Sequence, residues 1–248
     1  MYEKRLKGVV IPMITPMNED STVDDESLKN FVNFLVEAKT DALYPNGTNG
    51  ESLLLSQAER EHIAEVIAET NDHRLPLFIQ CGSMTTAETA SHAQHAVKIG
   101  ADGIGVMSPA FFGMDEESLF QYYAAVIEKL PKDFPVYIYN IPGCTTNDVS
   151  PALLHRLMST FENVVGIKYS NPNLMRVEDY LNTDGRVPEL LIGCDSLFLQ
   201  CLTTGGVGTV TGPGSVFYER FNRLYRQFQE GDFQGAMETQ KKIVETDR

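Results

Sequence analysis

Short apolar segments alternate with longer amphipathic segments along the whole of this chain. The apolar segments have the length of buried strands, and several are rich in Val and Ile. They comprise residues 8–14, 41–44, 77–80, 103–107, 136–139, 164–168, 189–192 and 208–210. The amphipathic segments, which have helical periodicity, comprise residues 27–39, 57–70, 85–99, 115–130, 150–160, 173–181, 195–204 and 215–229. The pattern therefore predicts eight strand-then-helix units.

No Pro/Gly/Ser-rich linker and no change of composition divides these units. Ser56 and Glu59 have the spacing of a capping box at the start of the second helix. Eight βα units in one domain favour a closed (β/α)8 barrel, or TIM barrel, over the alternative of an open doubly wound sheet. We expect the barrel to occupy residues 1–230. An amphipathic segment at 233–245 predicts a short C-terminal helical extension over residues 231–248.

The composition narrows the possible partners. The chain has 248 residues, a hydrophobic fraction of 42% and a formal net charge of −14, so its length fits a barrel of roughly 250 residues. An acidic surface repels phosphate backbones and anionic lipids, and we expect neither a nucleic-acid nor a membrane partner. The N-terminal sequence lacks the apolar core of a signal peptide, and the four cysteines show no Cys-x-x-Cys spacing. These features predict a cytoplasmic protein with reduced thiols.

Active sites of such barrels lie at the carboxyl ends of the strands, where Lys168 ends a strand with no other charge. Alternation along this strand predicts that Val164, Gly166 and Lys168 face one side, and that Val165 and Ile167 face the other. If the lysine points into the barrel, desolvation lowers its pKa and leaves a neutral amine that can form a Schiff base with a ketone. The alternative is a structural lysine whose ammonium group extends to solvent.

Two further groups are predicted at the same end of the barrel. Tyr139 ends the preceding strand, so its hydroxyl could move protons for an amine at Lys168; a structural aromatic is the alternative. The turn Gly47-Thr48-Asn49 follows the second strand. Its backbone amides can bind a small carboxylate, and the two polar side chains can add hydrogen bonds. Turns rich in Asn and Gly are common, so the turn alone is not specific.

Taken together, these segments resemble the pyruvate-dependent class I aldolases typified by dihydrodipicolinate synthase and N-acetylneuraminate lyase. The resemblance covers nearly the whole chain. The segments that carry it are Gly8-Val-Val-Ile-Pro-Met-Ile-Thr-Pro16, Gly47-Thr-Asn-Gly-Glu51, Leu55-Ser-Gln-Ala-Glu-Arg60, Tyr139-Asn-Ile-Pro142, Gly166-Ile-Lys168 and Gly193-Cys-Asp195.

The resemblance implies a homotetrameric barrel. We expect a homo-oligomer, either a dimer or a tetramer, that needs neither a metal nor an organic cofactor. It implies Lys168 as the Schiff-base lysine and Tyr139 as the proton shuttle. It also implies that Thr48 and Asn49 bind the pyruvate carboxylate, with Thr48 in the proton relay. Residues at other strand ends complete the predicted substrate-binding set: Gly47, Ser170, Gly193, Asp195 and Thr209.

The chain departs from the family pattern mainly where the second substrate would bind. Cys144 stands where dihydrodipicolinate synthases carry an arginine for the aldehyde's carboxylate, and cysteine offers no such fork. Phe111 lies where the family places a tyrosine that reaches the neighbouring subunit. Asn49 replaces the usual threonine and is similar to 4-hydroxy-2-oxoglutarate aldolases, while Ser196 follows Asp195 where lyases carry an acidic residue. The C-terminal helical segment is shorter than in the family.

The sequence therefore predicts a carbon–carbon lyase in which Lys168 condenses with pyruvate or a 4-hydroxy-2-oxo acid. The candidate substrates are a 2-keto-3-deoxy sugar acid, 4-hydroxy-2-oxoglutarate or a sialic acid. The alternatives are dihydrodipicolinate synthase, which joins pyruvate to aspartate semialdehyde, a sugar-acid dehydratase using the same imine, and a non-catalytic 2-oxo-acid sensor. A metal site at His92 and His95 is not favoured, because no further ligands accompany the two histidines. A phosphate site near residues 205–208 or 212–214 is not favoured either, because no Lys or Arg stands nearby.

Overall fold

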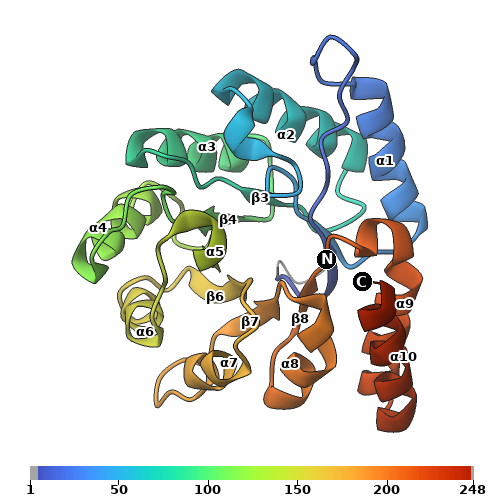
Figure 1. The fold of residues 1–248 in the computed structure, drawn as a ribbon. Helices are drawn as coiled ribbons and strands as arrows, with labels where there is room; N and C mark the ends of the chain where they lie inside the picture. The colour runs from blue at the N-terminus through green and yellow to red at the C-terminus, as the bar shows by residue number, and fades with distance from the viewer. Residues whose placement is uncertain (1–4, 247–248) are drawn as a thin grey trace.

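The computed structural model describes residues 5–246, and over these residues eight parallel strands form a barrel-shaped sheet (Figure 1). The strands are β1 (Gly8–Ile11), β2 (Ala42–Leu43), β3 (Phe78–Gln80), β4 (Gly103–Met107), β5 (Val136–Asn140), β6 (Val164–Tyr169), β7 (Glu189–Ile192) and β8 (Gly208–Val210). Their order in the sheet is β2-β1-β8-β7-β6-β5-β4-β3, and a parallel bridge between Leu43 and Leu77 joins β2 to β3. The predicted TIM barrel is confirmed, and the alternative of an open sheet is wrong.

Helices alternate with the strands and surround the barrel (Figure 1). They are α1 (Asp25–Glu37), α2 (Gln57–Asn71), α3 (Thr86–Lys98), α4 (Glu116–Ile127), α6 (Pro151–Thr160), α7 (Leu174–Leu181), α8 (Phe198–Thr204), α9 (Gly214–Gln229) and α10 (Phe233–Thr246). At the start of α2, Ser56 and Glu59 exchange the side-chain and backbone hydrogen bonds of a capping box, as predicted. Within residues 5–246, no helix has the length and apolar character needed to cross a membrane.

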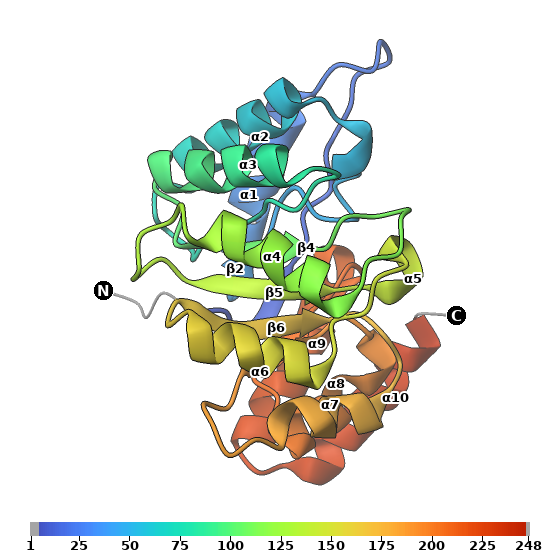
Figure 2. The ribbon, with the colours of Figure 1, turned by 90° about the vertical axis from the view of Figure 1, so that its left-hand side faces the viewer.

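Three short helical pieces at the carboxyl ends of the strands differ from the prediction. They are η1 (Ser52–Leu54), α5 (Pro142–Thr145) and η2 (Asp195–Leu197). The first two were not expected, because a single helical turn is too short to show an amphipathic period. The third separates from α8, so the helix predicted over residues 195–204 is divided. In Figure 2, α5 lies on the right-hand side of the molecule, where β5 ends.

Side chains fill the barrel interior, so it forms a packed core. The buried residues of this inner cluster are Leu6, Val10, Ala42, Tyr44, Phe78, Tyr137, Val165, Leu191 and Val210. Neighbouring strand positions, such as Val9 and Ile11, face the other way and belong to the larger cluster beneath the helices. Because both faces of the strands are buried, the strands read as continuous apolar segments in the sequence.

Strand β6 departs from simple alternation. Its pairing register with β5 shifts at Val165, which marks a bulge. Val165 therefore lies in the inner cluster, whereas Val164 joins Ile167 in the outer one. The prediction that Val164 shares the face of Lys168, and that Val165 shares the face of Ile167, is wrong. Alternation resumes after the bulge, and Lys168 faces the barrel interior.

Helix α10 packs along α9 and contacts the loop that follows β7. The amide of Gln240 donates from Nε2 to the carbonyl of Asp195 over 2.9 Å. Its Oε1 accepts a hydrogen bond of 2.8 Å from the backbone N–H of Leu199. One side chain of α10 thus fixes both η2 and the start of α8, close to the ends of the strands.

Candidate active site

Lys168 lies near the carboxyl end of β6, inside the mouth of the barrel. Its side chain is buried, with 4% exposure, and it pairs in register with Tyr139 of β5. The Nζ atom lies 3.6 Å from the centroid of the Tyr139 ring and 5.3 Å from that of Tyr44. No acidic side chain within residues 5–246 forms an ion pair with this amine. Aromatic rings, rather than a counter-charge, surround it.

Tyr139 connects this lysine to the turn after β2. Its buried hydroxyl lies 3.1 Å from Oγ1 of Thr48, and either oxygen can donate the hydrogen bond. Burial raises the pKa of Tyr139, but the positive charge of Lys168 and hydrogen bonds with Lys168, Thr48 and Ser170 lower it more. The net pKa lies below the ordinary value of 10.0. A phenol with a lowered pKa gives up its proton more readily, which suits a group that moves protons to and from an amine.

Tyr137 provides a comparison within the same strand. Its hydroxyl donates to the carboxylate of Glu189 and accepts from the backbone N–H of Leu6, at the amino ends of the strands. Burial and the negative charge of Glu189 raise the pKa of Tyr137 well above its ordinary value. The two tyrosines thus lie in opposite electrostatic surroundings, and Tyr139 is the one placed beside Lys168.

The turn Gly47-Thr48-Asn49 borders the mouth of the barrel, and both of its polar side chains are exposed. The amide of Asn49 extends towards the loop after β8. Its Nδ2 lies 2.6 Å from the position that a Cβ atom on Gly212 would occupy. Gly212 therefore leaves the space that this amide fills, and any larger residue there would displace it.

A buried network behind this turn was not predicted from the sequence. The side chain of Arg60, in α2, is 2% exposed and donates from Nη2 to the carbonyls of Gln80 and Gly82, over 3.1 and 3.2 Å. The carbonyl of Arg60 accepts a hydrogen bond of 2.9 Å from Nδ2 of Asn46. The amide of Gln80 donates to the carbonyl of Asn46 over 3.0 Å. The network fixes Asn46, whose left-handed backbone (φ 59°) leads into the turn.

Three more predicted residues follow the carboxyl ends of β6 and β7. Ser170, just beyond β6, takes part in the hydrogen bonding of the tyrosine hydroxyl. Its Oγ lies 2.0 Å from the position that a Cβ atom on Gly193 would occupy, so only glycine leaves room for it. Asp195 starts η2 on the same loop as Gly193 and is partly buried. The structure thus brings together residues from four strand ends.

Thr209 does not face this site. It is fully buried, and its Oγ1 donates a hydrogen bond of 2.9 Å to the carbonyl of Ile192. Its neighbour Val210 belongs to the inner cluster, and alternation therefore turns the Thr209 side chain towards the helices. The expectation that this side chain binds substrate is a misassignment, because the sequence position at a strand end did not reveal which face it occupies.

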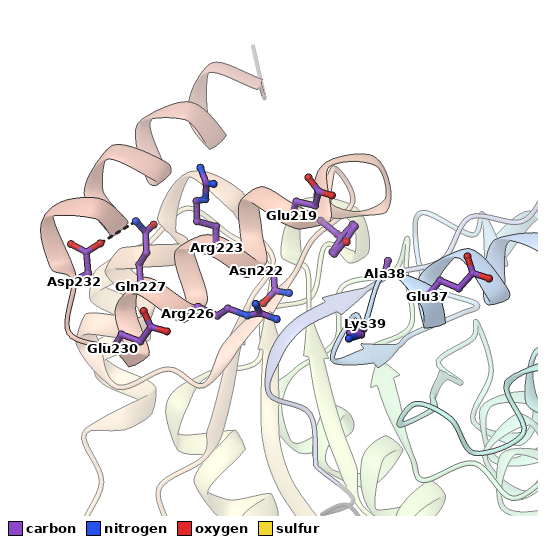
Figure 3. Close-up of a pocket in the computed structure, with 11 residues that line it drawn as sticks. Glu37, Ala38, Lys39, Glu219, Asn222, Arg223, Arg226, Gln227, Glu230 and Asp232 are labelled. Atoms are coloured by element: carbon purple, nitrogen blue, oxygen red, sulfur yellow. Dashed lines mark hydrogen bonds between the residues drawn. The ribbon is translucent and has the colours of Figure 1, made fainter.

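A cavity of about 220 Å³ opens beside Thr48. The other residues of its wall are Glu51, Ser52, Leu53, Leu54, Met107 and Cys144. A larger groove of about 720 Å³ lies away from the strand ends, between the end of α1 and helix α9. Figure 3 shows that its side chains are mostly charged and come from the outer surfaces of these helices. Because Thr48, the hydrogen-bond partner of Tyr139, lines the smaller cavity and none of the three predicted catalytic residues lines the larger groove, we place the candidate site at the smaller cavity.

The two histidines of α3 lie in different surroundings. Burial, followed by the charge of Arg60, lowers the pKa of His92 to about 4. His95 instead pairs with Glu65 on the neighbouring helix, with its Nε2 2.9 Å from the carboxylate. In the part of the chain from residue 5 to 246, no three His, Cys, Asp or Glu side chains group in a way that could hold a metal ion.

The sequence of the chain is similar to those of known proteins. The model of the dihydrodipicolinate synthetase family matches residues 5–246. A 4-hydroxy-tetrahydrodipicolinate synthase of Bartonella bacilliformis is 32% identical over 243 residues, covering 98% of this chain and 82% of the relative. A synthase of the same name from Phocaeicola vulgatus is 29% identical over 245 residues, covering 99% and 82%.

Solved structures of similar proteins have the same fold. The dihydrodipicolinate synthase of Aquifex aeolicus superposes with a TM-score of 0.93 at 31% identity, covering 97% of this chain and 81% of that one. YagE, a prophage protein of the dihydrodipicolinic acid synthase family from E. coli K12 solved with pyruvate, gives a TM-score of 0.91 at 27% identity, covering 96% and 80%. The chain therefore belongs to the dihydrodipicolinate synthetase family, and it is a carbon–carbon lyase.

Proposed function

We propose that this lyase is a Schiff-base, or class I, aldolase that forms or cleaves a 4-hydroxy-2-oxo acid. The two compounds that it joins or releases are pyruvate and an aldehyde. Its catalytic residues are Lys168, Tyr139 and Thr48. The observation that carries the proposal is the buried amine against the ring of a tyrosine that in turn bonds a threonine. Such a chain of groups supplies both the nucleophile and the proton shuttle that imine formation requires.

The reaction begins when the amine of Lys168, once it has given up its proton, adds to the C2 ketone of the oxo acid. One proton passes from the nitrogen to the oxygen and Tyr139 gives a second, so that the oxygen leaves as water and a protonated imine remains. The C4 hydroxyl then loses its proton through Tyr139 and Thr48. The C3–C4 bond breaks, its electron pair moves towards the imine nitrogen, and an aldehyde departs. The remaining enamine takes a proton at C3, and water releases pyruvate from the lysine; the reverse sequence makes the aldol.

The neighbouring rings and the turn support the same assignment. Aromatic ring faces attract a cation, so the rings of Tyr44 and Tyr139 would stabilise the protonated imine. The backbone amides of Gly47 and its turn would bind the pyruvate carboxylate, and fix the ketone in position for attack. In this proposal Asn49, Ser170, Gly193 and Asp195 complete the substrate-binding set, and Thr209 contributes through its backbone alone. No metal and no organic cofactor take part.

The second candidate is 4-hydroxy-tetrahydrodipicolinate synthesis, because the relatives from Bartonella bacilliformis and Phocaeicola vulgatus carry that name. That reaction joins pyruvate to an aldehyde that bears a carboxylate. The exposed Cys144 in the cavity wall carries no positive charge with which to bind one. A sugar-acid dehydratase and a 2-oxo-acid sensor would use the same lysine and are separated by assays of turnover. The aldolase would then act on a sugar-acid, oxoglutarate-type or sialic-acid substrate.

We also propose that the enzyme works in the cytoplasm as a homo-oligomer, either a dimer or a tetramer. The four cysteines are free thiols, which supports a reducing compartment. The exposed Phe111 and Phe112 support assembly, because adjoining apolar rings exposed to this extent are typical of contact surfaces.

Borohydride reduction in the presence of pyruvate tests the aldolase proposal. We expect one reduced pyruvate adduct per chain, mapped by peptide mass spectrometry to Lys168. The Lys168→Ala variant should form no adduct and should lose aldol turnover by at least about a thousandfold. Lys168→Arg is the matched control, since it keeps a cationic side chain that cannot condense with a ketone. An adduct on another lysine, or turnover without any adduct, would contradict the proposal.

A further inference from the structure

We propose that the cavity beside Thr48 receives the aldehyde half of the substrate, and that it accepts an uncharged aldehyde with a small apolar substituent. This inference rests on the proposed function, because it assigns the second substrate of the same site. It goes further, because it replaces the sugar-acid, oxoglutarate-type and sialic-acid substrates named above, whose aldehydes carry a carboxylate or several hydroxyls, with an uncharged apolar aldehyde as the preferred partner.

The position of the cavity follows from Thr48, which belongs to both parts of the site. Its Oγ1 lies 3.1 Å from the hydroxyl of Tyr139, and Tyr139 in turn lies over the amine of Lys168. The same threonine forms part of the cavity wall. A substrate bound as an imine on the lysine, with its C4 hydroxyl near Thr48, therefore directs the substituent on C4 into this cavity.

The chemistry of the wall favours an apolar substituent. Leu53, Leu54, Met107 and Cys144 present aliphatic or sulfur-bearing side chains. Leu54 is 81% exposed and Leu53 46% exposed, so both retain apolar surface that a ligand can cover. Covering such surface favours binding, because it removes apolar area from water. The described wall contains no lysine or arginine, and its one charged residue is Glu51.

That charge pattern opposes an acidic aldehyde. A carboxylate placed in this cavity would lose water without gaining a cationic partner, and it would approach the carboxylate of Glu51. A polyhydroxylated aldehyde fits poorly for a different reason. Its hydroxyl groups need partners, and the wall offers only the hydroxyls of Thr48 and Ser52 and the Glu51 carboxylate, with Ser52 itself 3% exposed.

The volume sets the size of the substituent. At about 220 Å³ the cavity is smaller than the roughly 300–1,000 Å³ of pockets that hold drug-sized ligands. A chain of a few carbons fits this space, whereas the polyol tail of a sialic acid would extend out of it. The cavity therefore indicates a short acceptor such as a simple aliphatic aldehyde.

Three aldehydes of equal chain length test the inference: butanal, succinic semialdehyde and erythrose. Aldol addition to saturating pyruvate is followed by chromatography of the 4-hydroxy-2-oxo acid product, and kcat/KM is measured for each acceptor. We expect butanal to exceed the other two by at least about tenfold. A preference for succinic semialdehyde or for erythrose, or no reaction with butanal, would overturn the inference.

Variants at Cys144 sharpen the test. Cys144→Arg adds a guanidinium to the cavity wall, and we expect it to raise kcat/KM for succinic semialdehyde relative to butanal by at least about tenfold. Cys144→Ser, the control, changes the side chain at nearly constant size and should leave the order of the aldehydes as it is. If Cys144→Arg leaves the ratio unchanged, Cys144 does not face the acceptor and the inference fails.

Borohydride trapping of pyruvate on the same proteins separates the two proposals. An adduct on Lys168 combined with the wrong acceptor preference would contradict the acceptor inference alone. Absence of the adduct from the wild-type protein would instead contradict the Schiff-base mechanism itself.

Discussion

At the residue scale, the proposed chemistry depends on how neighbours set the proton affinity of one phenol. Tyr139 and Tyr137 are both buried on one strand, yet the pKa of the first is lowered and that of the second is raised. The difference comes from the partners, since Lys168 is positive and Glu189 is negative. The same residue type can therefore serve as a proton shuttle at one end of the barrel and as a structural link at the other.

The hydrogen bond from Thr48 contributes to the lowered pKa of Tyr139, and its removal gives a signed prediction. In the wild type, the phenol loses its donating proton as the pH rises through a pKa below 10, so kcat should fall in that range. In Thr48→Val the phenolate loses one stabilising partner, the pKa of Tyr139 rises, and the alkaline arm of the kcat profile should move to higher pH. We also expect kcat to fall about 10- to 100-fold, because the relay is broken.

The measurement is the pH–rate profile of aldol cleavage for wild type, Thr48→Val and Thr48→Ser. The serine variant keeps a hydroxyl and should retain the wild-type alkaline arm. If the valine variant shows that arm at unchanged or lower pH, Thr48 does not act on the proton of Tyr139.

At the element scale, helix α2 does more than cover the barrel, because it carries Arg60 on the face that packs inwards. Arg60 stands three and seven residues before Ile63 and Ile67, and all three are buried. A charged residue at that spacing was a signal available in the sequence. The hydrogen-bond partners of Arg60 could not be predicted from the sequence, because they are the backbone carbonyls of Gln80 and Gly82, which only the fold brings near.

Replacement of Arg60 should disturb the substrate-binding turn as well as the stability. Arg60→Met removes the guanidinium donor from two buried carbonyls, of which that of Gly82 keeps only the long hydrogen bond of 3.4 Å from Gln80, and we expect the free energy of unfolding to fall by about 2–3 kcal/mol in urea denaturation. Because the turn would lose its support, KM for pyruvate should rise about tenfold at temperatures where the variant stays folded. The alkaline arm assigned to Tyr139 should not move.

Arg60→Lys serves as the control, since an ammonium group can satisfy one of the carbonyls and should recover part of the pyruvate affinity. A purely structural role for Arg60 would give a stability loss with unchanged KM in the folded variant.

Helix α3 carries a pH-sensitive element at His92. Its pKa is lowered to about 4, whereas an unfolded histidine titrates near 6.5. Between these values the unfolded chain binds more protons than the folded one, so the folded state loses stability as the pH falls from about 6.5 to 4. Arg60 and His95 reinforce this shift and Glu61 opposes it.

Lowering the pH from 7 to 5 should reduce the free energy of unfolding of the wild type by about 1–2 kcal/mol more than that of His92→Gln, whose side chain cannot take up a proton. Urea denaturation at both pH values gives the comparison, and the exposed His73→Gln serves as the control. An equal loss of stability in wild type and His92→Gln would show that His92 is protonated without cost in the folded protein.

At the scale of the whole molecule, the repeated pattern was sufficient to predict the barrel, because every strand buries both faces and every helix buries one. The inward direction of Lys168 also follows from alternation, but only beyond the bulge at Val165. The bulge itself depends on the register with β5, and the face of Thr209 depends on its neighbour Val210. Pairing between strands fixes both features, so no local pattern could have predicted them.

The excess of acidic over basic residues is also a property of the whole molecule, since a net charge of −14 lies on a compact barrel. Repulsion among these charges opposes folding, and salt screens it over a Debye length that falls from roughly 10 Å at 0.1 M to 3 Å at 1 M. We therefore expect Tm to rise by a few degrees between these NaCl concentrations, at about 2–4 °C for each kcal/mol gained. The triple variant Glu19→Gln, Glu128→Gln, Asp133→Asn removes three exposed negative charges and should show a smaller rise. Salt also acts on stability through its general effect on water, and that effect is the same in the wild type and the triple variant. An equal rise in Tm in the two proteins would therefore exclude charge repulsion as the cause.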